Sequence, residues 1–142
     1  QKMKNKPLSP ESRLLILDNC NGCIISNDTP CEMGLTASHF FKSNTMKGNP
    51  FWDYSDPNNA VCMCSKHHDE FEKLNANDRI EYIKEYSCIS FILLRKILDR
   101  MKALLKGKRP KSIYPKAKMN KKNVGKMLTK TIVKEFLPDE KF

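Results

Sequence analysis

Two short pairs of soft metal ligands, far apart in this chain, constrain its fold more than any other feature. Cys20-x-x-Cys23 lies near the start and Cys64-x-x-His67 near the middle of the 142 residues. Structural zinc takes four nitrogen or sulfur ligands in a tetrahedron, and the x-x spacing lets one turn of backbone supply two of them. The two pairs together predict one closed, structural zinc site that ties the N-terminal turn to the middle of the chain.

The other cysteines are either alternative ligands for this site or not ligands. On an expected strand, Cys62 would point the same way as Cys64, but the spacing to His67 favours Cys64. We expect Cys31 to be a free thiol and Cys88 to be a small buried hydrophobic residue.

Targeting signals are not evident in the sequence. The N-terminus is polar, which is not typical of a signal peptide, and no apolar run reaches the length of a membrane span. We therefore expect a cytoplasmic protein, or a nuclear one in a eukaryote, and not a secreted one. In such compartments paired cysteines are more often metal ligands than disulfides.

The positive charge is concentrated at the C-terminal end. Residues 1–100 carry 13 Lys and Arg against 13 Asp and Glu, whereas residues 101–142 carry 13 against 3 and so hold the whole net charge of +10. A neutral body with a basic tail predicts a polyanion partner, most simply nucleic acid, with DNA ahead of RNA. The alternative is a lysine-rich tail that is only solvated. The predicted contacts are Lys106, Lys108, Arg109, Lys111, Lys116, Lys118, Lys121 and Lys122.

Local patterns predict an α+β fold, a small zinc-stapled core with added helices. Ser9-Pro10 starts a helix that runs to about residue 18. Strands over 35–41 and 59–63 flank a long loop, in which we expect Trp52 to pack rather than stack on bases. Further helices are expected over 65–74, 77–86, 89–105 and 123–137. The chain thus divides into an N-terminal arm and helix (1–18), a core (19–86), a packing helix (87–106) and a basic extension (107–142).

A second group of residues has the composition of a hydrolytic site. His39 stands on an expected strand, His68 opens a helix, and Glu72 lies one turn later on the same helix face. Hydrolysis of a phosphodiester needs a base to activate water and a divalent metal to polarise the phosphate. A histidine titrates in the right range to be that base. Taken alone, His39 would be an ordinary structural histidine. The presence of His68 and Glu72 in the same chain favours a functional role.

In this order the residues resemble the HNH endonuclease family. The resemblance covers about residues 18–86, half of the chain. It is most similar to the phage recombination nucleases of the NinG/Rap type and more loosely to endonuclease VII, through a small residue before His39 and an aromatic after it. The matching elements are Cys20-x-x-Cys23, His39, Asn59-Ala-Val-Cys-Met-Cys64 and the pair His67-His68.

The resemblance implies a fold, a reaction and a set of roles. It implies two antiparallel strands and a helix around one catalytic ion, Mg²⁺ or Mn²⁺, beside the structural Zn²⁺. His39 would be the general base, Asn59 would hold the loop that orients it, and His68 would bind the catalytic ion with Glu72 as a second ligand. The activity would be metal-dependent hydrolysis of DNA, with branched or recombination intermediates among the substrates.

Two positions depart from the family pattern. His67 replaces the usual fourth cysteine, and Cys₃His is an ordinary zinc set. Ser38 stands where many members carry a metal-binding Asp or His, which leaves His68, Glu72, water and the substrate phosphate for a magnesium-like ion. Ser38 therefore favours an alternative, a catalytically inactive zinc-stapled nucleic-acid-binding protein. A third interpretation is a subunit of a nucleoprotein assembly. A dimer is compatible with all three.

Overall fold

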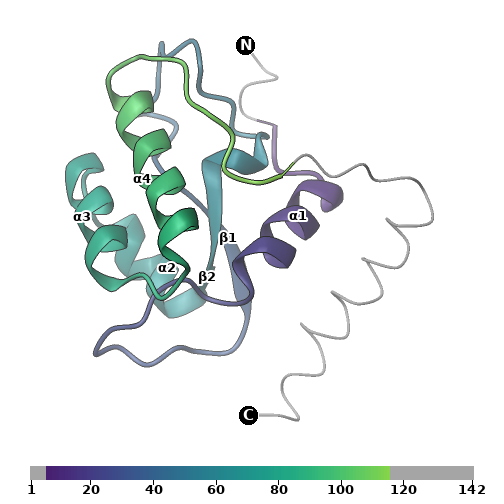
Figure 1. The fold of residues 1–142 in the computed structure, drawn as a ribbon, viewed down its shortest axis with the longest axis vertical. Helices are drawn as coiled ribbons and strands as arrows, with labels where there is room; N and C mark the ends of the chain where they lie inside the picture. Colours follow the sequence, from purple (N-terminus) through teal and green to yellow (C-terminus); the bar gives the residue numbers. More distant parts are fainter. Residues whose placement is uncertain (1–5, 116–142) are drawn as a thin grey trace.

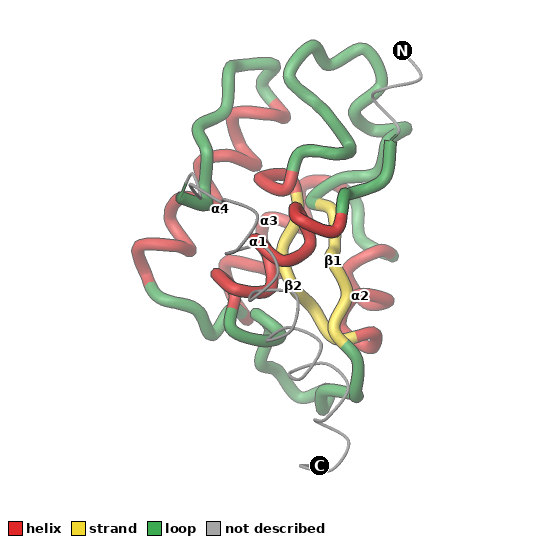
Figure 2. The backbone as a smooth tube through the Cα atoms, turned by 90° about the vertical axis from the view of Figure 1, so that its right-hand side faces the viewer, coloured by secondary structure: helices red, strands yellow, loops and turns green. Residues whose placement is uncertain are grey.

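The computed structural model describes residues 6–115 of the chain. Figure 1 shows two strands at the centre, with α1 on one side and α3 and α4 on the other, and Figure 2 shows α2 close beside the strands. The elements are α1 (Pro10–Cys20), β1 (Leu35–His39), the 3-10 turn η2 (Pro57–Asn59), β2 (Ala60–Cys64), α2 (Ser65–Glu72), α3 (Ala76–Tyr86) and α4 (Phe91–Leu105). The predicted mixture of helices with a two-stranded sheet is confirmed. The predicted helix over 123–137 and four predicted contacts, Lys116, Lys118, Lys121 and Lys122, lie outside the described residues.

The two strands form an antiparallel pair at the heart of the core. Leu35 pairs with Cys64 and His39 with Ala60, so β1 ends earlier than predicted. Every residue of β2 is buried, and both α1 and α2 contact this strand. A short unbroken apolar run such as Ala-Val-Cys-Met-Cys is typical of a strand that is covered on both faces. This burial fixes the starting point of α2, which follows β2 without a loop.

Polar side chains cap α1, α3 and α4, and the Ser9 cap of α1 is the one that the sequence predicted. Ser9, Asn75 and Ser90 each accept a hydrogen bond from a backbone N–H in the first turn of α1, α3 and α4. At α2 the cap is a sulfur, because the Sγ of Cys64 accepts from the N–H of His67. No helix within the described residues is long and apolar enough to cross a membrane.

The chain that follows α4 folds back onto the core. Figure 1 shows this segment crossing from α4 towards α1. Ile113 and Tyr114 are buried, and their N–H groups donate to the Oδ1 of Asn58 at 2.8 and 3.0 Å. The Tyr114 hydroxyl donates to the carbonyl of Ala60 at 2.7 Å. The first part of the basic extension is therefore anchored beside η2 and the start of β2.

Candidate metal centres

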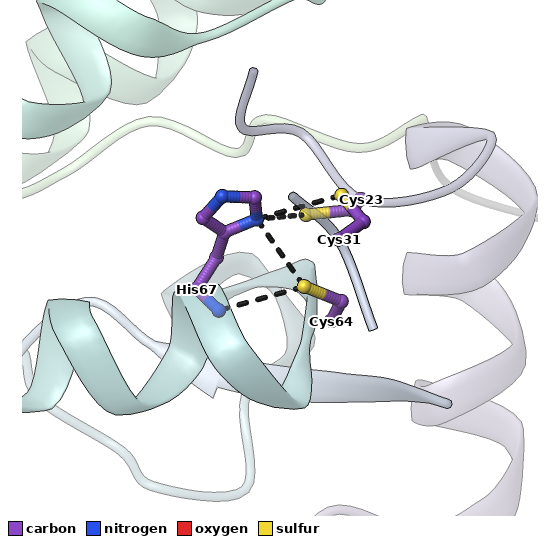
Figure 3. A group of neighbouring side chains, drawn as sticks. All are labelled: Cys23, Cys31, Cys64 and His67. Atoms are coloured by element: carbon purple, nitrogen blue, oxygen red, sulfur yellow. Dashed lines mark hydrogen bonds between the residues drawn. The ribbon is translucent and has the colours of Figure 1, made fainter. Parts of the chain in front are cut away.

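Four side chains from separate segments converge to form a Cys₃His cluster. Within the described residues this is the one group of three or more His, Cys, Asp or Glu whose ligand atoms all lie within 4.8 Å of one another. The Nδ1 of His67 lies 3.4, 3.5 and 3.2 Å from the Sγ atoms of Cys23, Cys31 and Cys64 (Figure 3). Tetrahedral zinc with ordinary bond lengths separates a nitrogen and a sulfur ligand by about 3.6 Å. The cluster could therefore hold a zinc ion.

Hydrogen bonds orient His67 toward the three sulfurs. Its Nε2 lies 2.9 Å from both the Oδ1 of Asn27 and the carbonyl of Thr29. Because those oxygens only accept, Nε2 carries the hydrogen and Nδ1 keeps its lone pair for a metal. Glu70 in turn accepts from the Thr29 and Tyr82 hydroxyls at 2.6 and 2.8 Å, and these bonds lower the pKa of Glu70. Such outer contacts are typical of metal-binding histidines.

The three thiols differ in their readiness to ionise. Burial raises the pKa of Cys23 to about 12 and also raises the pKa of Cys31. Burial acts on Cys64 as well, but hydrogen bonds from the backbone N–H groups of His67 and Glu32 and from the thiols of Cys31 and Cys23 together outweigh it, so the pKa of Cys64 lies below its usual value. A thiol at a helix N-terminus ionises readily. Cys64 is therefore the thiolate that could receive a metal first, and a bound ion would deprotonate the others.

Cys20 does not belong to this cluster. It is the last residue of α1, buried, with its Sγ 3.4 Å from the Tyr114 hydroxyl. The helix continues past its predicted end, and the turn comes only at Asn21 and Gly22, whose φ angles are 54° and 111°. Cys20 therefore faces the core from a helix. The predicted ligand set is corrected at one position, because Cys31 stands where Cys20 was expected.

The loop over 26–30 explains why spacing alone does not identify Cys31. This loop closes because Asn27 and Thr29 contact His67, and that closure brings Cys31 to the cluster. Cys88 also differs from the prediction, since it is exposed and its Sγ donates to the Cys23 carbonyl at 3.5 Å.

His68 and Glu72 form a second polar pair on α2. The Nε2 of His68 lies 3.0 Å from the Oε1 of Glu72, and its Nδ1 lies 2.7 Å from the Oγ1 of Thr36. The Thr36 hydroxyl also lies 2.9 Å from the Met63 carbonyl, so its one hydrogen goes either to that carbonyl or to the Nδ1 of His68. Glu72 only accepts, so the Nε2 of His68 carries the hydrogen of their bond.

This pair offers two atoms, Nε2 and Oε1, that a cation would bind in place of the shared hydrogen. The side chains of His68 and Glu72 are 24% and 42% exposed, which leaves room for water or a phosphate oxygen. The other oxygen of Glu72 lies 3.4 Å from the Nη2 of the buried Arg79. The donor set of one imidazole and one carboxylate suits a divalent cation.

His39 lies at the end of β1, in contact with two aromatic side chains. Its ring stacks on Tyr54 with centroids 3.8 Å apart, and Trp52 meets it edge-on at 6.3 Å. The Nε2 of His39 lies 2.8 Å from the Tyr54 carbonyl, so Nε2 carries the hydrogen and Nδ1 keeps a lone pair. Burial is the largest effect on the pKa of His39 and lowers it. Of the nearby groups, Glu72 raises this pKa and His68 lowers it by smaller amounts. Burial therefore favours the neutral form of His39. Among the described residues, the ligand atoms of His39, His68 and Glu72 do not all lie within 4.8 Å of one another.

Asn59 closes the loop between the strands. It is completely buried, and its Nδ2 donates to the Asp53 carbonyl at 2.9 Å while its own carbonyl accepts from the Phe40 N–H at 2.8 Å. Its Oδ1 accepts from the Nε of Arg100 at 2.8 Å. These contacts are those of a loop-holding residue. Trp52 packs in the core as predicted.

Ser38, the position that departs from the family pattern, is also completely buried. Alternation along β1 places it on the same face as Thr36, which contacts His68. Its hydroxyl has no hydrogen-bond partner among the described residues.

No family model, curated protein or solved structure matches this chain.

The predicted nucleic-acid contacts that lie within the described residues are all exposed. They begin at the end of α4 and follow the segment that folds back onto the core. The guanidinium of Arg109 lies 5.5 Å from the centre of the Phe51 ring, which links this segment to the loop beside His39. The four residues are Lys106, Lys108, Arg109 and Lys111.

Proposed function

We propose that this chain is a metal-dependent endonuclease of the HNH type that hydrolyses phosphodiester bonds in DNA. One observation carries the proposal: His39 has a ring nitrogen without a hydrogen bond among the described residues, and His68 and Glu72 form a partly exposed pair of ligand atoms. His39 keeps Nδ1 as a base because Nε2 is bonded to the Tyr54 carbonyl. The Nε2 of His68 and the Oε1 of Glu72 are the two atoms that would bind the divalent ion in place of their hydrogen bond. A hydrolase needs both a base and a metal-binding group.

The proposed mechanism assigns a proton transfer to His39. A divalent ion held by His68 and Glu72 would supply charge to polarise the phosphate and stabilise the leaving oxygen. The Nδ1 of His39 takes a proton from a water molecule as the water oxygen attacks phosphorus. The bond from phosphorus to the leaving sugar oxygen breaks, and that oxygen takes a proton from solvent. The Tyr54 carbonyl accepts from Nε2 throughout, which stabilises the imidazolium that forms.

The side chain of Ser38 affects how many protein ligands the proposed catalytic ion would have. Its hydroxyl is buried without a partner among the described residues, on the strand face of Thr36. An unpartnered buried hydroxyl is costly, and an oxygen ligand to a hard cation would relieve that cost.

The basic surface supports DNA as the substrate. Lys106, Lys108, Arg109 and Lys111 are exposed on the segment that packs beside the loop of His39. Contacts to phosphates would position a duplex without reading its sequence. A preference for branched DNA rests only on the resemblance to recombination nucleases.

A nucleic-acid-binding protein without catalysis is the second candidate. Two observations favour it: serine at position 38 is a weaker ligand than aspartate, and Arg79 already neutralises part of the Glu72 charge. In that case zinc would hold the fold, and the basic segment would account for binding.

Cleavage of plasmid and branched DNA with Mg²⁺ or Mn²⁺ separates the two candidates. We expect metal-dependent nicking that falls by about 10²- to 10⁴-fold in His39→Ala, the usual range for removal of a general base. Glu72→Gln should raise the metal concentration needed, whereas Asp69→Asn, an exposed acid on the same helix, should not. Zinc content and thermal unfolding establish that the variants are folded. DNA binding without cleavage under any metal would refute the enzyme.

A further inference from the structure

A buried arginine from outside the strand–helix unit reaches the loop beside His39. Arg100 lies on α4 and is only 4% exposed. Its Nε donates to the Oδ1 of Asn59 at 2.8 Å, its Nη1 to the Lys111 carbonyl at 2.7 Å, and its Nη2 to the Oδ2 of Asp56 at 3.2 Å. All three bonds go to the loop or to the segment that folds back over it.

These bonds determine which way the Asn59 amide faces. A guanidinium only donates, so Arg100 requires the amide oxygen of Asn59 on its side. The Nδ2 of Asn59 must then face the other way, where it donates to the Asp53 carbonyl at 2.9 Å. The next residue, Tyr54, offers the carbonyl that accepts from the Nε2 of His39 at 2.8 Å. Donors and acceptors thus alternate without ambiguity from Arg100 to His39.

We infer that Arg100 is a positioning residue for His39: it orients the Asn59 amide, which holds the Asp53–Tyr54 backbone, which determines the nitrogen of His39 that carries the hydrogen. This inference rests on the proposed role of His39 as the base. It also assigns a role to α4, which lies outside the residues that resemble the HNH family.

Packing alone does not account for an arginine at this position. Its neighbours on the buried face of α4 are Ile97, Met101 and Leu104, which are completely buried and apolar. Replacement of a buried ion pair by well-packed apolar residues is often neutral or stabilising. Burial lowers the pKa of Arg100, whereas the carboxylate of Asp56 raises it. Among the described residues, the partly exposed Asp56 is the one acidic side chain that pairs with this guanidinium. An apolar residue would lack all three directed bonds of Arg100, and the bond to Asn59 is the one that leads toward His39.

The test is the tautomer of His39, read by ¹⁵N NMR of the histidine rings in the full-length, zinc-loaded chain. Wild type should show a protonated Nε2 and a bare Nδ1. Arg100→Met keeps the length of the side chain and removes its donors, so His39 should populate both tautomers. The kcat for DNA cleavage should fall by about 10- to 100-fold, the range seen when outer contacts of a site are lost, with KM almost unchanged. Arg100→Lys, which retains one donor, should restore part of both. Arg95→Met, an exposed arginine on the same helix, should change neither.

The outcomes distinguish this inference from the proposed function. A folded Arg100→Met chain with the wild-type His39 signal and wild-type kcat would overturn the inference while the nuclease stands. A shifted tautomer in a protein that does not cleave DNA would support the role of Arg100 and refute the nuclease. If Arg100→Met does not fold, Asn59→Asp decides, because it removes the donor to Asp53 and keeps a partner for Arg100. An unchanged His39 signal in that variant would overturn the inference.

Discussion

His67 and His68 are neighbours in the chain, yet they face sites of different chemistry. His67 donates its Nε2 hydrogen to Asn27 and Thr29 and turns Nδ1 toward three sulfurs. His68 contacts Thr36 through Nδ1 and Glu72 through Nε2. Adjacent side chains on a helix point about 100° apart, so the first turn of α2 can serve both sites.

The comparison shows how the first turn of α2 could hold a structural ion on one side and, in the proposed function, a catalytic ion on the other. The Cys₃His cluster offers four soft ligands and no place for water, which suits a permanent structural ion. The pair of His68 and Glu72 offers one nitrogen and one oxygen at a partly exposed position, where the proposed function places an exchangeable ion that also contacts substrate.

Removal of a ligand from the Cys₃His cluster should have the largest effect. The free energy of binding a structural zinc is also free energy of folding, so Cys31→Ser should lose the ion and its cooperative thermal unfolding. Metal analysis and calorimetry, with and without a chelator, measure both. Cys20→Ala should keep one zinc per chain although it leaves a small cavity. Zinc retained by Cys31→Ser and lost by Cys20→Ala would contradict the ligand set.

Two threonines offer a way to perturb one site at a time. Thr36→Val removes the hydroxyl that contacts the Nδ1 of His68, so Mn²⁺ affinity should fall by about 10- to 100-fold while zinc affinity stays. Thr29→Val removes only the bond to Glu70 and should weaken zinc modestly while Mn²⁺ affinity stays. Metal titrations of both variants test this pattern. Equal loss of both metals in either variant would mean that the sites are not independent.

The pH dependence of cleavage should reflect the buried position of His39. Burial lowers the pKa of His39 below its usual value of 6.5, and the neutral ring is the active base. At saturating metal, the half-maximal kcat should therefore lie below pH 6.5. The stability that His39 contributes to the fold should also be lost as the pH falls through its lowered pKa, because the folded state favours the neutral form. A half-maximal rate at or above pH 6.5 would contradict this assignment.

The smallest effect is expected at the basic surface. Lys108→Gln and Arg109→Gln should each weaken DNA binding about equally for all sequences and reduce the slope of log affinity against log salt by about 1. Binding isotherms at several salt concentrations measure the slope. Lys66→Gln, an exposed lysine on α2, serves as a comparison. An unchanged slope would exclude phosphate contacts at this segment.

Much of the fold follows from local patterns, because caps and apolar periodicity are local. Ser9-Pro10 starts α1 as predicted, and the apolar run before Cys64 becomes the buried strand. Cys31 could not be recognised from spacing, because the closure of its loop depends on hydrogen bonds to His67 and Glu70.

The contacts of the second site were only partly predictable. The sequence brings His68 and Glu72 together through one helical turn, and they pair in the structure. The bond from Arg100 to Asn59 joins residues far apart in the chain, so no periodicity indicates it. An arginine in an amphipathic pattern is ordinarily assigned to the solvent face.

The central claim is that the two neighbouring histidines serve two different ions, and a Mn²⁺ titration of the zinc-loaded chain, followed by electron paramagnetic resonance, tests it most directly. The account predicts one bound Mn²⁺ per chain beside one retained zinc. His68→Gln should lose the Mn²⁺ and keep the zinc. Absence of bound Mn²⁺ in wild type, or Mn²⁺ binding that survives His68→Gln unchanged, would contradict it.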